Sequence, residues 1–135
     1  MEKFVLYKKT YDFVLWLYPL INCLPKNHRL ILGRKLEELA IQLLMNLMKA
    51  NKSRGLERKQ LQSESSDTLD YLRIMIRLAK DARHISVKQY LVSVELLNEI
   101  GRMLKTWDSY RKQDWFNEIE YSEFTTKEVN RFLGL

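Results

Sequence analysis

Residues 32–48 read LGRKLEELAIQLLMNLM, and this stretch decides the fold class. Leucines recur along it at steps of three and four residues, at Leu32, Leu36, Leu39, Leu43 and Leu47. At about 100° per residue, these steps put all of these leucines on one stripe of an α-helix, with charged residues such as Arg34 and Glu38 on the opposite face. The pattern therefore predicts an amphipathic helix over 29–52.

Similar patterns before and after this stretch predict three more helices, over 4–23, 56–83 and 86–112. The last of them starts with a capping box, in which Ser86 and Gln89 satisfy unpaired backbone amides. Long helices joined by short connections predict an all-α fold. We expect an antiparallel up-and-down four-helix bundle over 1–112 and a short C-terminal appendage over 113–135.

Two of the predicted helices contain a weak point. Pro19 is expected to kink the first helix or to end it near Tyr18, because proline removes one backbone hydrogen bond. The polar, serine-rich segment 60–67 is expected to fray or to delay the start of the third helix. Gly55 is expected to mark the turn between the second and third helices.

Each helix is expected to turn one apolar face inward. On the first helix this face holds Tyr7, Tyr11, Val14, Leu15, Tyr18 and Ile21. On the third helix it holds Leu61, Ser65, Thr68, Leu72, Met75, Ile76 and Ala79. On the fourth helix it holds Tyr90, Leu91, Val94, Leu97, Leu104 and Trp107. Tyr71, Ile74 and Leu78 lie off the inner face of the third helix, so we expect them to contact another helix or another subunit.

The composition narrows the class of protein further. The 135 residues include only 4 Gly and 2 Pro, too few for the turns of an all-β fold, and the 46% of apolar residues excludes a disordered chain. The longest nearly apolar run, 13–24, is too short to span a bilayer, and the first residues do not resemble a signal peptide. We therefore expect a cytoplasmic protein with no membrane partner.

The net charge of +6 is unevenly distributed. Residues 1–112 carry +9, and the aromatic, acidic segment 113–135 carries −3. A basic body is typical of proteins that bind polyanions, most often nucleic acid. The alternative is a surface charge that only keeps the protein soluble.

No residue pattern indicates an enzyme. The glycines do not form a phosphate-binding loop. Cys23 lies five residues before His28, and a Cys–His pair can be nucleophilic, but the position of Cys23 near the inner end of a helix favours a buried core thiol. The single cysteine and two histidines do not match a metal-ligand pattern. We expect no catalytic residue, no metal site and no cofactor.

A basic row is the strongest candidate for a binding surface. Arg73, Arg77, Lys80 and His84 fall within about 60° of one another on the third helix, over about 17 Å. Such a row can contact several phosphates and give affinity without sequence readout. The alternative is a solvated face on which Asp70 and Asp81 pair with the arginines.

The fourth helix adds two candidate cations, Arg102 and Lys105, on either side of Gly101. A glycine inside a helix costs about 1 kcal/mol relative to alanine, and its usual reason is the close approach of another helix. Trp107 lies at core spacing, so we interpret it as a packing residue rather than a platform for bases.

Three segments resemble a known family in order and spacing. They are LYP at 17–19 followed by LPKNHR at 24–29, LDYLRIMIR at 69–77, and EIGRMLKTW at 99–107. Together they resemble Avd, the accessory variability determinant of diversity-generating retroelements, over 11–112. The acidic segment 113–135 lies outside the resemblance.

The resemblance implies more than the residues alone. Avd proteins are four-helix bundles that assemble as basic homopentamers, bind the retroelement's reverse transcriptase and nucleic acid, and support mutagenic cDNA synthesis without being enzymes. Arg73 and Arg77 match the family's basic pair, and Gly101 would serve subunit packing. Lys26 and Arg29, in the first matching segment, complete the set of candidate binding residues. The partners it implies are a reverse transcriptase, RNA and possibly DNA, and further copies of the chain.

A related bundle family provides the alternative. The ribosomal-RNA intervening-sequence proteins share the fold and the pentamer. A resemblance to them would imply that this chain is a homo-oligomer with a structural or protein-interaction role. Their second helix ends in a small-residue motif of the type SIPxNIAEG. Residues 43–51 here read LLMNLMKAN, without that motif, which favours Avd.

Overall fold

The computed structural model describes residues 2–108. Within this range the chain forms long helices and no strand: α1 (Glu2–Asn22), α3 (Arg34–Lys52), α4 (Gly55–Asp81) and α5 (Val87–Asp108). A short α2 (Lys26–His28) and a π-helical segment η1 (Arg29–Gly33) lead directly into α3. The predicted appendage over 113–135, and the predicted end of the fourth helix over 109–112, lie outside the described residues.

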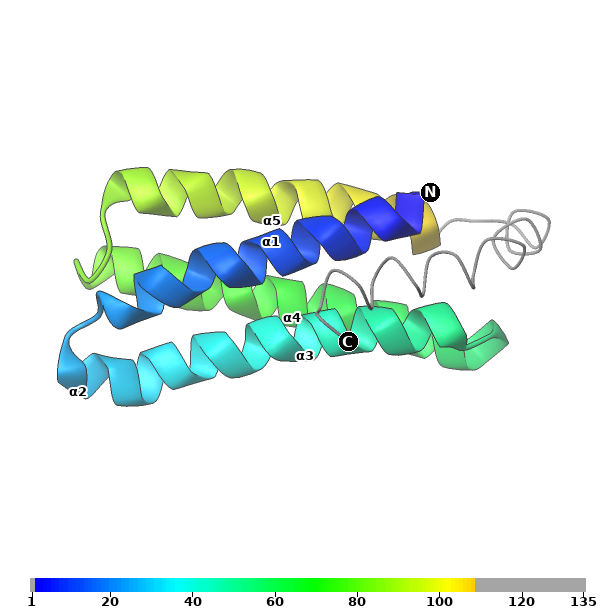
Figure 1. The fold of residues 1–135 in the computed structure, drawn as a ribbon, viewed down its shortest axis with the longest axis horizontal. Helices are drawn as coiled ribbons and strands as arrows, with labels where there is room; N and C mark the ends of the chain where they lie inside the picture. The colour runs from blue at the N-terminus through cyan, green and yellow to red at the C-terminus, as the bar shows by residue number, and fades with distance from the viewer. Residues whose placement is uncertain (1, 109–135) are drawn as a thin grey trace.

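The long helices lie side by side and alternate in direction, which confirms the predicted all-α, antiparallel up-and-down four-helix bundle (Figure 1). Neighbouring helices pack in the order α1, α3, α4, α5 and back to α1. The Tyr7 hydroxyl donates to the Leu47 carbonyl across 2.7 Å and links α1 to α3. Lys9 and Glu99 form an ion pair of 3.0 Å that links α1 to α5.

The leucine stripe on which the fold prediction rests lies in the core. All of its members are buried, namely Leu32, Leu36, Leu39, Leu43 and Leu47. Burying a leucine side chain stabilises the fold by about 1.5–3 kcal/mol, so this stripe supplies a large share of the stability of the bundle.

The predicted inner faces of the first and fourth helices are partly wrong. Leu15 and Tyr18 are exposed on α1, and Leu91 is exposed on α5. The other predicted members that are buried are Tyr7, Val14, Ile21, Leu97, Leu104 and Trp107, which confirms this part of the prediction. The buried residues that the prediction missed are Leu6, Phe13, Leu17 and Leu20 on α1 and Ser93 and Ile100 on α5. Apolar residues occur all round these two helices, so the spacing of apolar residues does not by itself identify which of them are buried.

Pro19 does not end the first helix, which continues to Asn22. The proline is exposed, and its own carbonyl still accepts a hydrogen bond from the Cys23 amide at 3.2 Å. Buried Leu17 and Leu20 on either side keep the helix in place. Cys23 itself is exposed, so the predicted core thiol is wrong: the chain leaves the helix at this point, and Leu24 enters the core in its place.

The start of α4 is neither frayed nor delayed, because a buried arginine anchors it. The Arg58 guanidinium donates from Nε to the carbonyls of Ala50 (3.0 Å) and Ser53 (3.1 Å), and from Nη2 to that of Asn51 (3.2 Å). It also lies 5.5 Å from the centre of the Trp107 ring. The polar first half of α4 therefore satisfies the last carbonyls of α3, a need that helical periodicity does not reveal.

The connections between helices follow the predicted breaks. Gly55 has a φ of 59°, a left-handed value that glycine adopts without strain, in the turn between α3 and α4. At the start of α5, the Ser86 amide donates to Gln89 Oε1 (2.8 Å) and the Gln89 amide donates to Ser86 Oγ (3.0 Å), which confirms the capping box. A Cβ on Gly33 would lie 2.9 Å from Ile21 Cγ2, so this glycine lets η1 approach α1.

Candidate nucleic-acid and partner interface

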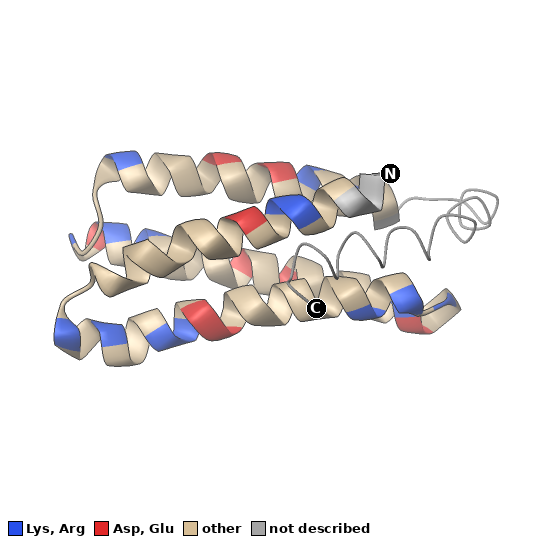
Figure 2. Ribbon diagram, in the orientation of Figure 1, with Lys and Arg blue, Asp and Glu red and all other residues tan. Residues whose placement is uncertain are grey.

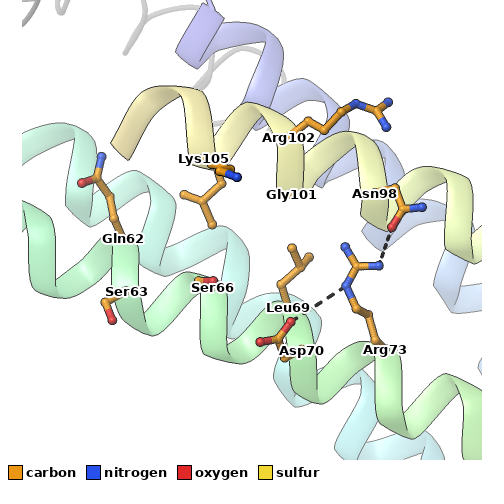
Figure 3. A pocket seen from close by; sticks show the side chains of 11 residues that line it. Gln62, Ser63, Ser66, Leu69, Asp70, Arg73, Asn98, Gly101, Arg102 and Lys105 are labelled. Carbon is orange, nitrogen blue, oxygen red and sulfur yellow. Dashed lines mark hydrogen bonds and ion pairs between the residues drawn. The ribbon is translucent and has the colours of Figure 1, made fainter. Parts of the chain in front are cut away.

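Arg73 joins α4 to α5. Its Nη1 donates to Asn98 Oδ1 across 2.6 Å, and its Nη2 donates to the Leu97 carbonyl across 3.2 Å. Its Nε lies 4.0 Å from Asp70 Oδ1 on the same helix. Arg73 was predicted to lie in a row of cations open to solvent, but its guanidinium reaches across to the neighbouring helix (Figure 3).

Gly101 makes room for this contact. A Cβ at this position would lie 3.2 Å from Arg73 Nη2 and 3.2 Å from Leu69 Cδ2. The predicted reason for a glycine inside the fourth helix, the close approach of another helix, is therefore confirmed. The approaching helix is α4 of the same chain.

Arg77 and Lys80 share one carboxylate. Asp81 Oδ2 lies 3.7 Å from Arg77 Nε, and Asp81 Oδ1 lies 3.0 Å from Lys80 Nζ. The hydrogen bond from Lys80, with the positive charges of Lys80 and Arg77, lowers the pKa of the Asp81 carboxyl below its ordinary value, against the opposing effect of desolvation. Lys80 Nζ also lies 4.8 Å from the centre of the Tyr90 ring. Asp70 and Asp81 thus pair with cations of the same helix, as the alternative of a solvated face predicts.

His84 does not extend the row along α4. The helix ends at Asp81, and Arg83 has a φ of 63°, which turns the chain out of the helical path. The His84 ring lies against the ring of His28 in α2, with centroids 4.1 Å apart and an interplanar angle of 34°. His84 therefore lies beside the segment that contains Lys26 and Arg29, and not in line with Arg73 on α4.

Lys26 and Arg29 flank His28 at this end of the bundle, and both side chains are exposed. Figure 2 shows Lys and Arg gathered where α2, the start of α3 and the turn between α4 and α5 meet. We call Lys26, Arg29, Lys80, Arg83 and Lys88, with the adjacent rings of His28 and His84, the basic end. Asp81 is the acidic residue that the structure places beside it.

Arg102 and Lys105 lie elsewhere, on a groove between α4 and α5. The groove has a volume of about 530 Å³ and includes Arg73 in its wall. Its α4 side carries polar residues from the serine-rich first half of that helix, and its α5 side carries the cations (Figure 3). We call it the α4–α5 groove; its polar lining is Gln62, Ser63, Ser66, Asp70, Arg73, Asn98, Arg102 and Lys105.

The structure thus divides the candidates into two groups. Arg73, Arg102 and Lys105 line the α4–α5 groove, whereas Lys26, Arg29, Lys80 and His84 belong to the basic end. Arg77 lies between them and, with Arg73, lines a smaller apolar cavity of about 250 Å³. The sequence prediction missed Asn98, Ser63 and Ser66 as site residues. Gln62 falls in the same helical sector as the basic row, but it was not among the predicted binding residues.

Residues 2–108 contain no group of three or more His, Cys, Asp or Glu side chains that could hold a metal ion. None of the described helices is long and apolar enough to cross a membrane.

These features define a four-helix bundle with a basic end and a polar groove between α4 and α5. Residues 4–111 match the family model described as bAvd-like. Because the match covers most of the chain, the protein belongs to the bAvd-like family, a family of accessory, non-catalytic proteins. No curated protein matches the sequence.

Proposed function

We propose that this chain is a non-catalytic accessory protein of a diversity-generating retroelement. It binds the element's reverse transcriptase and its RNA, and possibly DNA, in the cytoplasm, and it supports mutagenic cDNA synthesis. The match of residues 4–111 to the bAvd-like family carries the proposal. The excess of positive charge over residues 1–112 supports it, because basic surfaces attract the phosphate backbone.

The working form of the protein is proposed to be a homo-oligomer, with a pentamer as the expected size. Its support is an apolar strip on the outer face of α4, where Tyr71 is 55% exposed, Ile74 65% and Leu78 53%. Monomers seldom leave such a strip open to water. Light scattering that gives only a 16.3 kDa particle at micromolar concentration would contradict this.

The test of function is a charge reversal that leaves the fold alone. Arg29 and Arg77 are exposed, and among residues 2–108 neither joins two helices through a hydrogen bond, so the double variant Arg29→Glu, Arg77→Glu is expected to fold. Arg73 is unsuitable for this test because it holds α4 to α5. We expect the double variant to lose cDNA synthesis in a reaction containing the reverse transcriptase and template RNA.

A matched control reverses two positive charges at the opposite end of the bundle. Lys49 and Lys52 are exposed near the end of α3, far along the bundle from the basic end. The double variant Lys49→Glu, Lys52→Glu is expected to keep cDNA synthesis near the wild-type yield. A wild-type cDNA yield from the Arg29→Glu, Arg77→Glu variant would contradict the proposal.

A second candidate function is that of a purely structural oligomer that does not bind nucleic acid, the role considered above for the ribosomal-RNA intervening-sequence type of protein. The intramolecular partners of Arg73, Arg77 and Lys80 favour it, because these cations already contact protein groups. Filter binding across a salt series separates the two functions. A steep loss of binding with salt supports the accessory function, and no binding at low salt supports the structural one.

A further inference from the structure

The α4–α5 groove differs from the rest of the basic surface because it is concave. Its volume of about 530 Å³ lies within the range of about 300–1,000 Å³ that is typical of sites for small organic ligands. Gly101 contributes no side chain to its α5 wall, and Leu69 and Leu104 supply apolar contact beneath the polar rim. A flat cationic face binds only a backbone, whereas a groove of this size takes in part of the ligand.

The groove is also rich in hydrogen-bond donors that the fold leaves unused. Ser65 and Thr68 on α4 donate their hydroxyls to the carbonyls four residues earlier, at 2.8 and 2.9 Å. Ser63 and Ser66, which line the groove, make no such bond in the described part of the chain. Such hydroxyl donors suit a ligand with several acceptor oxygens.

Asn98 and Gln62 extend this set with side-chain amides. Asn98 Oδ1 accepts a hydrogen bond from Arg73, which holds the Asn98 side chain in the wall of the groove. Gln62 is buried in the wall of the groove. Amides of this kind bind the edges of nucleobases, because each offers a donor and an acceptor side by side.

Charge selects the class of ligand. Arg102 lines the groove, and its guanidinium has no hydrogen bond or ion pair among residues 2–108. An arginine fork matches the geometry of a phosphate, which it can bind through two parallel hydrogen bonds. Asp70, which also pairs with Arg73, is the one carboxylate in the lining, and it can accept from a ribose hydroxyl or a base amino group of the same ligand.

We propose that the α4–α5 groove binds one unpaired nucleotide of a single-stranded nucleic acid. Arg102 contacts its phosphate, and the amide and hydroxyl side chains of Gln62, Ser66 and Asn98 contact its base. A duplex cannot use the groove, because its bases are stacked and their pairing edges are occupied. This inference rests on the proposed function, since it assigns one part of the nucleic-acid contact to a particular cavity.

The experiment fills the groove without changing its charge. In Ser66→Leu the larger side chain occupies the space where the base would enter, on an exposed helical position that tolerates leucine. Binding is measured by fluorescence anisotropy with a labelled 12-nucleotide RNA, the DNA strand of the same sequence, and the RNA duplex. We expect Ser66→Leu to weaken single-strand binding about tenfold, the range for one lost base contact, and to leave duplex binding unchanged.

Two controls isolate the effect of the groove. Gln60→Leu places the same side chain on α4 outside the groove and is expected to bind all three probes like the wild type. Ser63→Leu fills the groove from a second position, so the test stands even if Ser66→Leu does not fold. Folding of each variant is checked by far-UV circular dichroism.

Charge is tested separately through the salt dependence of binding. Arg102→Gln is expected to reduce the slope of log K against log salt for the single strand by about 0.7, the contribution of one phosphate. Lys49→Gln removes one positive charge outside the groove and is expected to leave this slope unchanged. If Asp70 accepts from the ribose hydroxyl, the wild type binds the RNA strand more tightly than the DNA strand and Asp70→Asn abolishes this preference; equal binding of the two strands excludes that contact.

The outcomes distinguish this inference from the proposed function. Wild-type affinity of Ser66→Leu and Ser63→Leu for the single strands would overturn the groove as a binding site, while nucleic-acid binding by the basic surface would stand. If the wild-type protein binds none of the three probes at low salt, nucleic-acid binding itself fails, and the groove proposal fails with it.

Discussion

Arg73→Ala removes the side chain that joins α4 to α5. The variant loses a hydrogen bond of 2.6 Å to Asn98 and one of 3.2 Å to the Leu97 carbonyl. Hydrogen bonds that involve a charged group contribute about 1.5–3 kcal/mol when they are buried. The Arg73 side chain is 35% exposed, so water replaces part of what is lost. The ion pair with Asp70, at 4.0 Å and largely exposed, adds little.

We therefore expect Arg73→Ala to lower the free energy of unfolding by about 1–2 kcal/mol, with a fall in Tm of about 3–8 °C. The measurement is urea unfolding followed by circular dichroism. All variants are compared at one protein concentration, because the apparent stability of an oligomer depends on concentration.

Two comparisons make the test specific to the helix–helix contact. Arg77→Ala removes an exposed pair on one helix and is expected to cost no more than about 0.5 kcal/mol. Arg73→Lys keeps the charge, but an ammonium group cannot span the two acceptors as the guanidinium does, so it is expected to behave like Arg73→Ala. If Arg73→Ala and Arg77→Ala unfold at the same urea concentration, Arg73 does not stabilise the contact between α4 and α5.

Three further predictions follow from other contacts. Gly101→Leu forces atoms into the space that Arg73 and Leu69 occupy, and urea unfolding is expected to show a loss of about 1–3 kcal/mol; an unchanged midpoint would mean that α4 and α5 separate freely. Arg58→Met leaves carbonyls at the end of α3 without their donor and is expected to cost about 2–4 kcal/mol by the same assay, with wild-type stability as the contrary result. Asp81 has a lowered pKa, so its contribution to stability is present above its ordinary value of 3.8 and is lost as the pH falls through the folded value. An NMR titration of the Asp81 carboxyl is expected to give a midpoint below 3.8 that rises in Lys80→Ala, and a midpoint unaffected by that substitution would contradict the assignment.

The fold could be predicted from the sequence because its main determinants are local. The leucine stripe of 32–48 and the capping box at Ser86 act within one helix, and both are present as expected. The errors arise where distant parts of the chain decide the outcome. Arg58 anchors α4 through carbonyls of α3, and the burial of Leu17 and Leu20 against other helices carries α1 past Pro19.

The candidate site was predictable only as a set of residue types. Helical angles put Arg73, Arg77 and Lys80 on neighbouring positions of one helix, but they do not show which neighbouring helix a long side chain will reach. Arg73 turns to α5 because Gly101 leaves space there, and His84 leaves the row because the helix ends at Asp81. Both outcomes depend on contacts between different helices, and these cannot be inferred from the spacing of residues along one helix.

The short connection between α3 and α4 has a consequence for how the chain folds. Only Ser53 and Arg54 separate the two helices, and Arg58 bridges them over eight residues of sequence. Closing so short a loop costs little chain entropy, whereas the contact between Lys9 and Glu99 joins the first and last helices and closes a much longer loop. The α3–α4 hairpin is thus expected to be the folding nucleus, on which α5 and then α1 assemble. Substitutions of Arg58 would then slow refolding, while substitutions of Lys9 would mainly speed unfolding.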